Sequence, residues 1–348
     1  MRIDGFEIGL NCRPFIIAEM SGNHNQSLAR ALEIVEAAVK SGAHALKLQT
    51  YTAYTMTLDL DEREFFIDDP NSLWHGNTLY SLYQQAYTPW EWHKPIMDRA
   101  RELGLVCFST PFDETAVDFL ESLDAPCYKI ASFENTDIPL IKRVAATGKP
   151  LIISTGMANI AELDETVQAA RANGCDDLIL LKCTSNYPAS PEDSNLRTIP
   201  HMRELFNCEV GLSDHTAGVG AAIAAVSLGA TVIEKHFTLS RADGGVDSAF
   251  SLEPDEMRCL VDESERAWQA LGWVSYGPTN SEKDSLVFRR SLYITEDMKA
   301  GDMLTKDNLR AIRPGYGLAP KYYEMLMGKR INRDVRKGTP MEWQMCWR

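Results

Sequence analysis

One pattern occurs eight times in the chain: a short apolar run that ends in polar side chains and is followed by a segment with helical spacing. The apolar runs cover residues 15–18, 45–49, 106–108, 127–130, 151–153, 178–181, 209–212 and 231–236. Short apolar strands that alternate with amphipathic helices are typical of parallel sheets covered on both faces. Eight such units over residues 15–271 predict a (β/α)8 barrel with the helices as its outer ring.

A doubly wound open sheet is the alternative architecture. It favours a glycine-rich phosphate turn after the first strand, but residues 19–25 read EMSGNHN, which is not GxGxxG. All eight predicted strands end in ionisable or hydroxyl-bearing side chains. Because a barrel builds its active site from the carboxyl ends of its strands, this placement favours the barrel.

Two histidines, His215 and His236, directly follow the last two apolar runs. In a parallel strand-helix-strand unit both imidazoles reach the same edge of the sheet, where two neutral rings can hold a divalent metal. Carboxylates lie beside them in the sequence, at Asp214 and Glu234. A single histidine at a strand end is more often a hydrogen-bonded structural residue, so both interpretations stay open on these residues alone.

The other strand ends carry ammonium, hydroxyl and carboxyl groups. Lysines with several hydroxyl donors suit a phosphate or carboxylate ligand, and Glu19 and Glu134 can transfer protons. Some of the lysines should instead pair with nearby carboxylates, and we expect at least one to form only an ion pair. The lysines are Lys47, Lys129, Lys182 and Lys235, and the hydroxyl residues are Ser109, Thr110, Ser132, Ser154, Thr155, Ser185 and Ser213.

Composition limits the possible partners and the compartment. The 348 residues carry a net charge of −14, which argues against nucleic acid or an anionic membrane surface as a partner. The eight cysteines form no CxxC pair and several lie in apolar runs, as expected in a reduced cytoplasmic protein. Neither a signal peptide nor an apolar run of membrane-spanning length is predicted.

The chain is predicted to divide into a barrel domain over residues 1–275, a linker over 276–287 and a small module over 288–348. Residues 294–302 and 331–339 share one pattern of apolar residues, Asp and Gly, which predicts a pseudo-symmetric β-rich unit. Within the barrel, residues 50–88 form a long insertion of the kind that serves as a lid or binding loop.

Several of these segments together resemble the sialic acid synthase family, and the C-terminal module resembles that family's antifreeze-like (SAF) domain. The similar segments, in order along nearly the whole chain, are 15–19, 23–25, 46–49, 109–113, 128–132, 154–157, 211–215 and 233–238. The resemblance implies condensation of phosphoenolpyruvate with the open aldehyde form of an N-acetylated amino sugar. It also implies a homodimer in which Arg313 reaches the barrel mouth from the partner subunit.

The family resemblance implies roles for individual residues. His215 and His236 would bind Mn²⁺ or another divalent cation that grips the sugar aldehyde, and Glu19 and Glu134 would handle protons. Phosphoenolpyruvate would be held by Lys47, Thr110, Lys129, Ser132, Ser154, Ser185 and Ser213, and the sugar by Gln49, Tyr187, Asp247 and Arg313.

Segments 20–27, 78–93 and 183–188 are similar to family members that use 2,4-diacetamido-2,4,6-trideoxy-L-altrose, and differ from neuraminate synthases. A 6-deoxy sugar carries a methyl group that needs an apolar wall, for which Tyr80, Tyr83 and Tyr187 are candidates. Ser185 stands where neuraminate enzymes tend to have Asn.

Two rival functions remain: a Schiff-base aldolase with Lys129 or Lys182 as nucleophile, and a non-catalytic sugar-binding protein.

Overall fold

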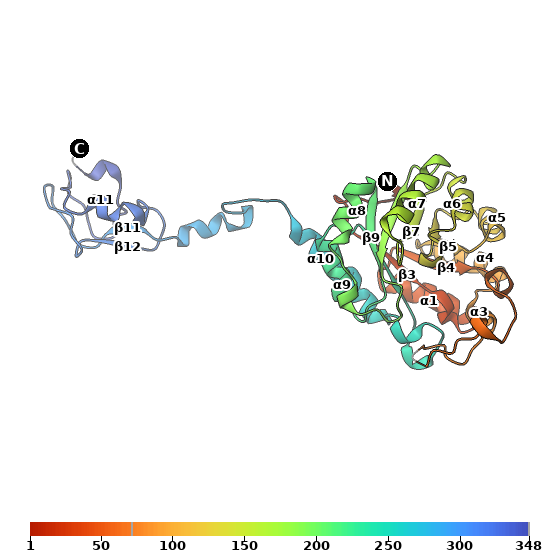
Figure 1. The fold of residues 1–348 in the computed structure, drawn as a ribbon. Helices are drawn as coiled ribbons and strands as arrows, with labels where there is room; N and C mark the ends of the chain where they lie inside the picture. The colour runs from red at the N-terminus through yellow and green to blue at the C-terminus, as the bar shows by residue number, and fades with distance from the viewer. Residues whose placement is uncertain (71, 347–348) are drawn as a thin grey trace. The chain divides into compact units, whose positions relative to one another are not determined.

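The computed structural model describes residues 1–70 and 72–346. Its contacts divide the chain into two compact units, residues 1–272 and residues 273–348 (Figure 1). Each unit has its own buried apolar cluster. Among the described residues, no helix is both long and apolar enough to cross a membrane.

The first unit is a closed barrel of eight parallel strands, as far as the described residues extend, which confirms the predicted (β/α)8 fold (Figure 1). Hydrogen bonds between β10 and β3 join the last strand to the first and close the sheet. The strands are β3 (Phe15–Glu19), β4 (Ala45–Thr50), β5 (Val106–Pro111), β6 (Tyr128–Ile130), β7 (Leu151–Ser154), β8 (Leu178–Cys183), β9 (Glu209–Asp214) and β10 (Val232–His236).

One main helix follows each strand and packs its apolar face on the barrel. The helices are α1 (Leu28–Lys40), α4 (Trp90–Glu102), α5 (Glu114–Ser122), α6 (Ile138–Ala145), α7 (Ile160–Ala172), α8 (Thr198–Phe206), α9 (Gly220–Ser227) and α10 (Pro254–Leu271). Side-chain caps at Ser27, Asp113 and Asn159 accept backbone N–H groups of the first helical turns. The helix α9 begins only at Gly220, because Gly218 adopts a φ of +70°, which no right-handed helix contains.

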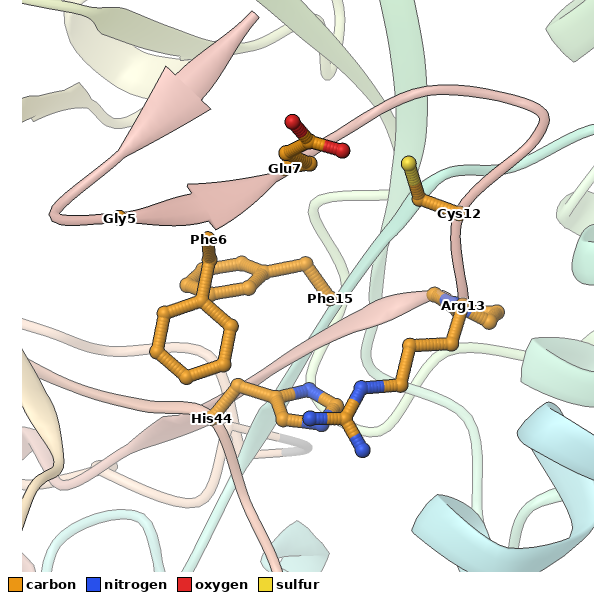
Figure 2. Close-up of a pocket in the computed structure, with 8 residues that line it drawn as sticks. Gly5, Phe6, Glu7, Cys12, Arg13, Phe15 and His44 are labelled. Atoms are coloured by element: carbon orange, nitrogen blue, oxygen red, sulfur yellow. The ribbon is translucent and has the colours of Figure 1, made fainter.

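A small hairpin that the sequence did not predict precedes the barrel. Its strands β1 (Arg2–Ile3) and β2 (Phe6–Glu7) pair antiparallel, and Ile3 packs against the apolar interior of the barrel. Beside the hairpin lies a cavity of about 280 Å³ where the side chains of Arg13 and His44 lie close together (Figure 2). His44 is held there because its Nδ1 accepts the Ile16 N–H at 2.9 Å. The hairpin thus covers the amino-terminal end of the barrel.

The insertion between β4 and α4 contains two short helices, α2 (Ala53–Met56) and α3 (Leu79–Ala86). A buried histidine ties each end of it to the barrel. At the start, Thr50 Oγ1 lies 2.8 Å from His93 Nε2, and at the end Thr88 Oγ1 lies 3.2 Å from His24 Nε2. The insertion is therefore anchored through two imidazoles.

The second unit is pseudo-symmetric, as its internal repeat predicted. Met298 and Val335 occupy equivalent positions in the two repeats and exchange both backbone hydrogen bonds at 2.9 Å. The equivalent glycines behave alike, since Gly301 N–H donates to Ile331 and Gly338 N–H donates to Ile294, each at 2.8 Å. The unit also contains β11 (Ser291–Ile294), β12 (Leu309–Ile312) and α11 (Tyr323–Leu326), and the predicted linker contains short 3-10 turns.

The buried histidines should make the barrel sensitive to acid. Burial lowers the pKa of His24 and of His93 from 6.5 to about 4, so the stability from their neutral forms is present above pH 6.5 and is lost as the pH falls toward 4. When the pH falls from 7.5 to 5, each of these two histidines should lower the free energy of unfolding by about 2 kcal/mol. We expect His93→Gln to reduce the fall in melting temperature between these two pH values. His201→Gln, on the exposed surface of α8, is the control; an unchanged fall in His93→Gln would contradict the assignment.

Candidate active site

Side-chain alternation along the barrel strands determines which polar residues face the interior. The interior apolar cluster includes Ile17, Ala45, Cys127, Ile152 and Val232, which lie near the strands' amino-terminal ends. Because side chains alternate between the two faces of a strand, the residue two positions further on also faces inward. These next residues are Glu19, Lys47, Lys129, Ser154 and Glu234, and all are buried. A charged layer therefore lies directly above an apolar one.

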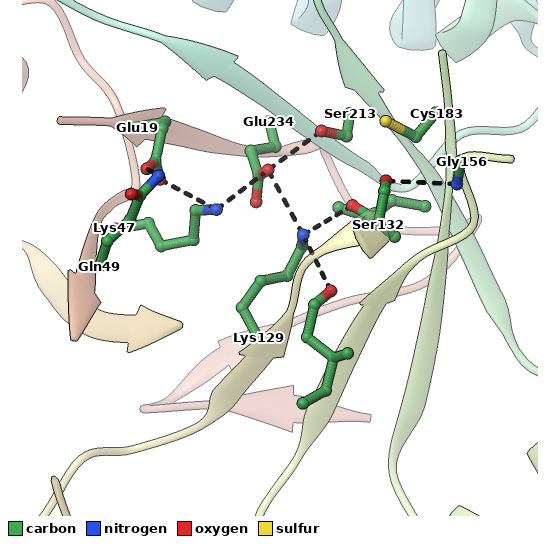
Figure 3. A network of polar contacts seen from close by, with 12 residues as sticks. Glu19, Lys47, Gln49, Lys129, Ser132, Gly156, Cys183, Ser213 and Glu234 are labelled. Carbon is green, nitrogen blue, oxygen red and sulfur yellow. Dashed lines mark hydrogen bonds and ion pairs between the residues drawn. The ribbon is translucent and has the colours of Figure 1, made fainter. Parts of the chain in front are cut away.

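The charged layer is one continuous network centred on Glu234 (Figure 3). Lys47 Nζ lies 3.2 Å from Glu234 Oε1 and 3.0 Å from Glu19 Oε2. Lys129 Nζ approaches the same Glu234 oxygen at 3.6 Å, and the Ser213 hydroxyl donates to it at 3.0 Å. Four strands, β4, β6, β9 and β10, thus meet at one carboxylate oxygen.

The two carboxyl groups of this network ionise differently. Burial raises the pKa of Glu19 to about 7, although Lys47 opposes the shift. Burial also acts to raise the pKa of Glu234, but Lys129 and Lys47 outweigh it and hold that pKa at about 2. Near neutral pH, two ammonium groups therefore share one fully ionised carboxylate and one partly protonated carboxyl. The remaining positive charge can be satisfied by an anionic ligand.

Hydroxyl groups extend the network to Gly156. Lys129 Nζ donates to Ser154 Oγ at 2.6 Å, and Gly156 N–H donates to Ser132 Oγ at 3.3 Å. A Cβ added at Gly156 would lie 2.7 Å from Ser132 Oγ and would overlap the Ser185 hydroxyl. Thr110 is buried on β5, and its hydroxyl has no hydrogen-bond partner among the described residues. A glycine is therefore required at residue 156 for the Ser132 and Ser185 hydroxyls to lie so close to the backbone.

The two predicted metal-binding histidines lie together, with ring centroids 5.5 Å apart. His215 Nδ1 donates to the Thr184 carbonyl at 2.9 Å, which leaves Nε2 as a free lone-pair donor. His236 Nδ1 is buried and has no hydrogen-bond partner among the described residues. These nitrogens fit a divalent cation, although no third His, Cys, Asp or Glu joins them in the described chain. Substrate or water oxygens would have to complete the coordination.

The residues proposed for the sugar lie in different parts of the molecule. Gln49 Nε2 donates to Glu19 Oε1 at 3.0 Å, and the Tyr187 ring lies 4.4 Å from the His215 ring. Asp247 is buried and accepts a hydrogen bond from the Ser21 hydroxyl, and burial raises its pKa. Arg313 belongs to the second unit, directly after β12.

Glu134 lies in the short turn after β6. One of its carboxyl oxygens is buried and has no hydrogen-bond partner among the described residues. Burial raises the pKa of this carboxyl to about 7, partly opposed by Lys129. A carboxyl with this pKa can exchange a proton near neutral pH.

Two of the predicted rim lysines face away from the barrel interior. Lys235 alternates with Glu234 and His236, and its Nζ forms a buried ion pair with Asp214 at 2.7 Å. At least one lysine was expected to pair with a nearby carboxylate, and Lys235 does so; its Nζ also donates to the Thr216 carbonyl at 2.6 Å. Lys182 lies between the inward-facing Leu181 and Cys183, and donates to the Cys183 carbonyl at 2.9 Å. Of the two proposed Schiff-base nucleophiles, only Lys129 faces the charged layer.

The sequence places Glu234 only beside His236 and among the possible partners of the lysines. In the structure it is the group that Lys47, Lys129 and Ser213 share. Alternation would have indicated this position, because Val232, Glu234 and His236 occupy one face of β10.

The fold is a (β/α)8 barrel, and its site combines a cluster of lysines and hydroxyls with paired histidines. This combination is typical of enzymes that act on a small anionic substrate. The sequence model of the NeuB family matches residues 34–276, and the chain belongs to this family. The sequence model of the SAF domain matches residues 289–345. These matches confirm the resemblance drawn from the motifs.

Individual relatives agree with the family assignment. The chain is 44% identical to a pseudaminic acid synthase of Campylobacter jejuni, over 94% of this chain and 95% of that protein. It is 38% identical to an N,N'-diacetyllegionaminic acid synthase of Legionella pneumophila, over 95% and 94% of the two chains. Among solved structures, an N-acetylneuraminic acid synthetase from Leptospira borgpetersenii matches with a TM-score of 0.73 and 30% identity, over 82% of this chain and 94% of that one.

The close packing at Gly156 can be tested by adding a methyl group. We expect Gly156→Ala to raise the KM for the anionic substrate about tenfold, because the methyl group would displace the Ser132 and Ser185 hydroxyls from their positions. Gly220→Ala is a matched control, since a Cβ at Gly220 would meet no atom within 4 Å. Steady-state kinetics on both variants, with melting temperatures to verify folding, would reveal the difference. Equal KM values would show that these two hydroxyls do not hold the ligand.

Proposed function

We propose that this protein is a pseudaminic acid synthase. It condenses phosphoenolpyruvate with 2,4-diacetamido-2,4,6-trideoxy-L-altrose and releases pseudaminic acid and phosphate. The observation that carries the proposal is the position of the two lysines and their hydroxyl neighbours next to the paired histidines. The 44% identity to a pseudaminic acid synthase over nearly the full length supports the choice of sugar.

Phosphoenolpyruvate carries a phosphate and a carboxylate, and the charged layer offers a cation for each. Lys47 and Lys129 both contact Glu234 Oε1 and would turn toward an incoming anion. The hydroxyls of Thr110, Ser132, Ser154, Ser185 and Ser213 would donate the remaining hydrogen bonds. This arrangement excludes water from both charges of the substrate because the lysines are buried.

The reaction forms a carbon–carbon bond to C3 and a carbon–oxygen bond from water to C2, and it breaks the carbon–oxygen bond between C2 and the phosphate. C3 of phosphoenolpyruvate attacks the aldehyde carbon of the sugar, and water adds to the cationic C2. The tetrahedral phosphate hemiketal then expels phosphate. A divalent cation held by His215 and His236 would supply Lewis acidity toward the aldehyde. Glu134 takes the proton of the attacking water, a role that its pKa of about 7 supports.

Further features of the family complete the proposal. Mn²⁺, or another divalent cation, is the expected metal. Gln49, Tyr187 and Asp247 would contact the sugar from the barrel, and Glu19 would bind its hydroxyls or move a proton. Arg313 would reach the sugar from the partner subunit of a domain-swapped homodimer located in the cytoplasm.

The main alternative is a different sugar. The 38% identity to an N,N'-diacetyllegionaminic acid synthase favours a second 6-deoxy diacetamido sugar as the next candidate, ahead of N-acetylmannosamine, the neuraminate precursor. A Schiff-base aldolase that uses Lys129 is the more distant alternative. In that enzyme borohydride would trap a substrate adduct and EDTA would have no effect.

The substrate can be tested by measuring phosphate release with a panel of N-acetylated amino sugars, with and without Mn²⁺. We expect release with the L-altrose derivative, loss of release with EDTA, and recovery when Mn²⁺ is added. Lys129→Gln should raise the KM for phosphoenolpyruvate, whereas Lys142→Gln, on the exposed side of α6, should not. Release that depends on neither sugar nor metal would contradict the proposal.

The partner role of Arg313 can be tested by complementation. We expect His215→Ala and Arg313→Ala to be inactive alone and, when co-expressed, to recover about a quarter of the wild-type activity. This fraction follows because half of the dimers are mixed and each mixed dimer has one intact site. Absence of recovery in dimers that form normally would mean that Arg313 acts within its own chain.

A further inference from the structure

Three aromatic rings from three separate loops gather beside the histidine pair. Tyr187, from the loop after β8, lies 4.4 Å from His215 and 5.3 Å from Phe250, measured between ring centroids. Phe250, from the loop after β10, lies 4.9 Å from His236. Trp74, from the insertion after β4, lies 6.2 Å from Tyr187. We call Trp74, Tyr187 and Phe250 the aromatic wall.

The wall is held in place by contacts other than those among its rings. Trp74 Nε1 donates to the Val246 carbonyl at 3.0 Å, which joins the insertion to the loop that carries Phe250. The only polar group of the indole is therefore occupied, and Phe250 is buried and has no polar atom on its side chain. These two residues present ring carbons to any ligand that extends from the histidines.

We infer that Trp74 and Phe250 select a sugar whose far end is a methyl group rather than a hydroxymethyl group. This inference rests on the proposed function. If the aldehyde carbon lies at His215 and His236, a six-carbon chain can extend past the neighbouring rings. A 6-hydroxyl group placed against Trp74 or Phe250 would lose its water without gaining a hydrogen bond, whereas a methyl group is favoured there.

The candidates that the sequence offers for an apolar wall are Tyr80, Tyr83 and Tyr187. Of these, Tyr187 lies next to the histidines, whereas Tyr83 packs against Tyr51 at 5.8 Å. Trp74 was not a candidate, because only the folded insertion brings it near a residue more than a hundred positions away.

The test compares the diacetamido 6-deoxy sugar with the same sugar carrying a 6-hydroxyl. We expect the wild-type enzyme to prefer the 6-deoxy sugar by roughly tenfold or more in kcat/KM, the discrimination that one group in an apolar pocket provides. Trp74→Ala should bring this ratio close to one, mainly by lowering kcat/KM for the 6-deoxy sugar. Trp74→Phe should retain most of it. Tyr54→Ala, which removes an exposed ring from the same insertion, should leave the ratio unchanged.

The possible outcomes separate this inference from the proposed function. If Trp74→Ala lowers kcat/KM equally for both sugars, Trp74 only supports the loop, and the inference is wrong while the function stands. A wild-type enzyme without preference between the two sugars would likewise overturn only the inference. If neither sugar supports phosphate release, both fail. The melting temperature of each variant, and its KM for phosphoenolpyruvate, verify that the rest of the site remains intact.

Discussion

The barrel depends on the ion network in which Glu234 holds Lys47 and Lys129. Two ammonium groups buried in one layer would repel each other and lose their hydration, a cost that the shared Glu234 carboxylate offsets for both and that Glu19 offsets further for Lys47. Removal of one member of such a buried set typically costs about 3–5 kcal/mol, because the others remain uncompensated. The network is therefore a structural requirement of the barrel, and the positive charge it leaves unbalanced is what attracts an anion.

Side chains alternate along each strand with a period of two residues, and this period places the charged layer of the barrel directly above the apolar layer. Along β10, Val232, Glu234 and His236 face inward in succession, so that the side chains of the interior change from apolar to carboxylate to imidazole over five residues. Each step of two residues advances about 6–7 Å along the strand. The apolar layer gives the charged layer a rigid base and keeps water away from one side of it. The position of each functional group thus follows from strand alternation.

Much of the fold could be predicted from the sequence, because eight strand and helix units repeat regularly and several of the helices begin at a recognisable side-chain cap. The hairpin of β1 and β2 could not, since strands of two residues have no detectable period. The histidine pair was predicted from its repeat spacing. Lys129 faces the barrel interior, whereas Lys182 and Lys235 face away from it. These directions can be told apart only from the alternation of side chains along each strand. Contacts such as Trp74 with Tyr187 depend on the fold of a long insertion, for which no local pattern exists.

The amino-terminal hairpin has a consequence for the order of events during turnover. Ile3 and Ile8 fill the amino-terminal end of the barrel, so the described part of this unit offers ligands one entrance, at the carboxyl ends of the strands. Lys47 and Lys129 lie further from that entrance than His236 does. Both lysines contact Glu234, which precedes His236 by two residues on β10. A ligand bound at the histidines would lie between that entrance and the lysines. If the two histidines hold the sugar, as proposed above, the anion would have to enter before the sugar, and phosphate would leave after the sugar acid.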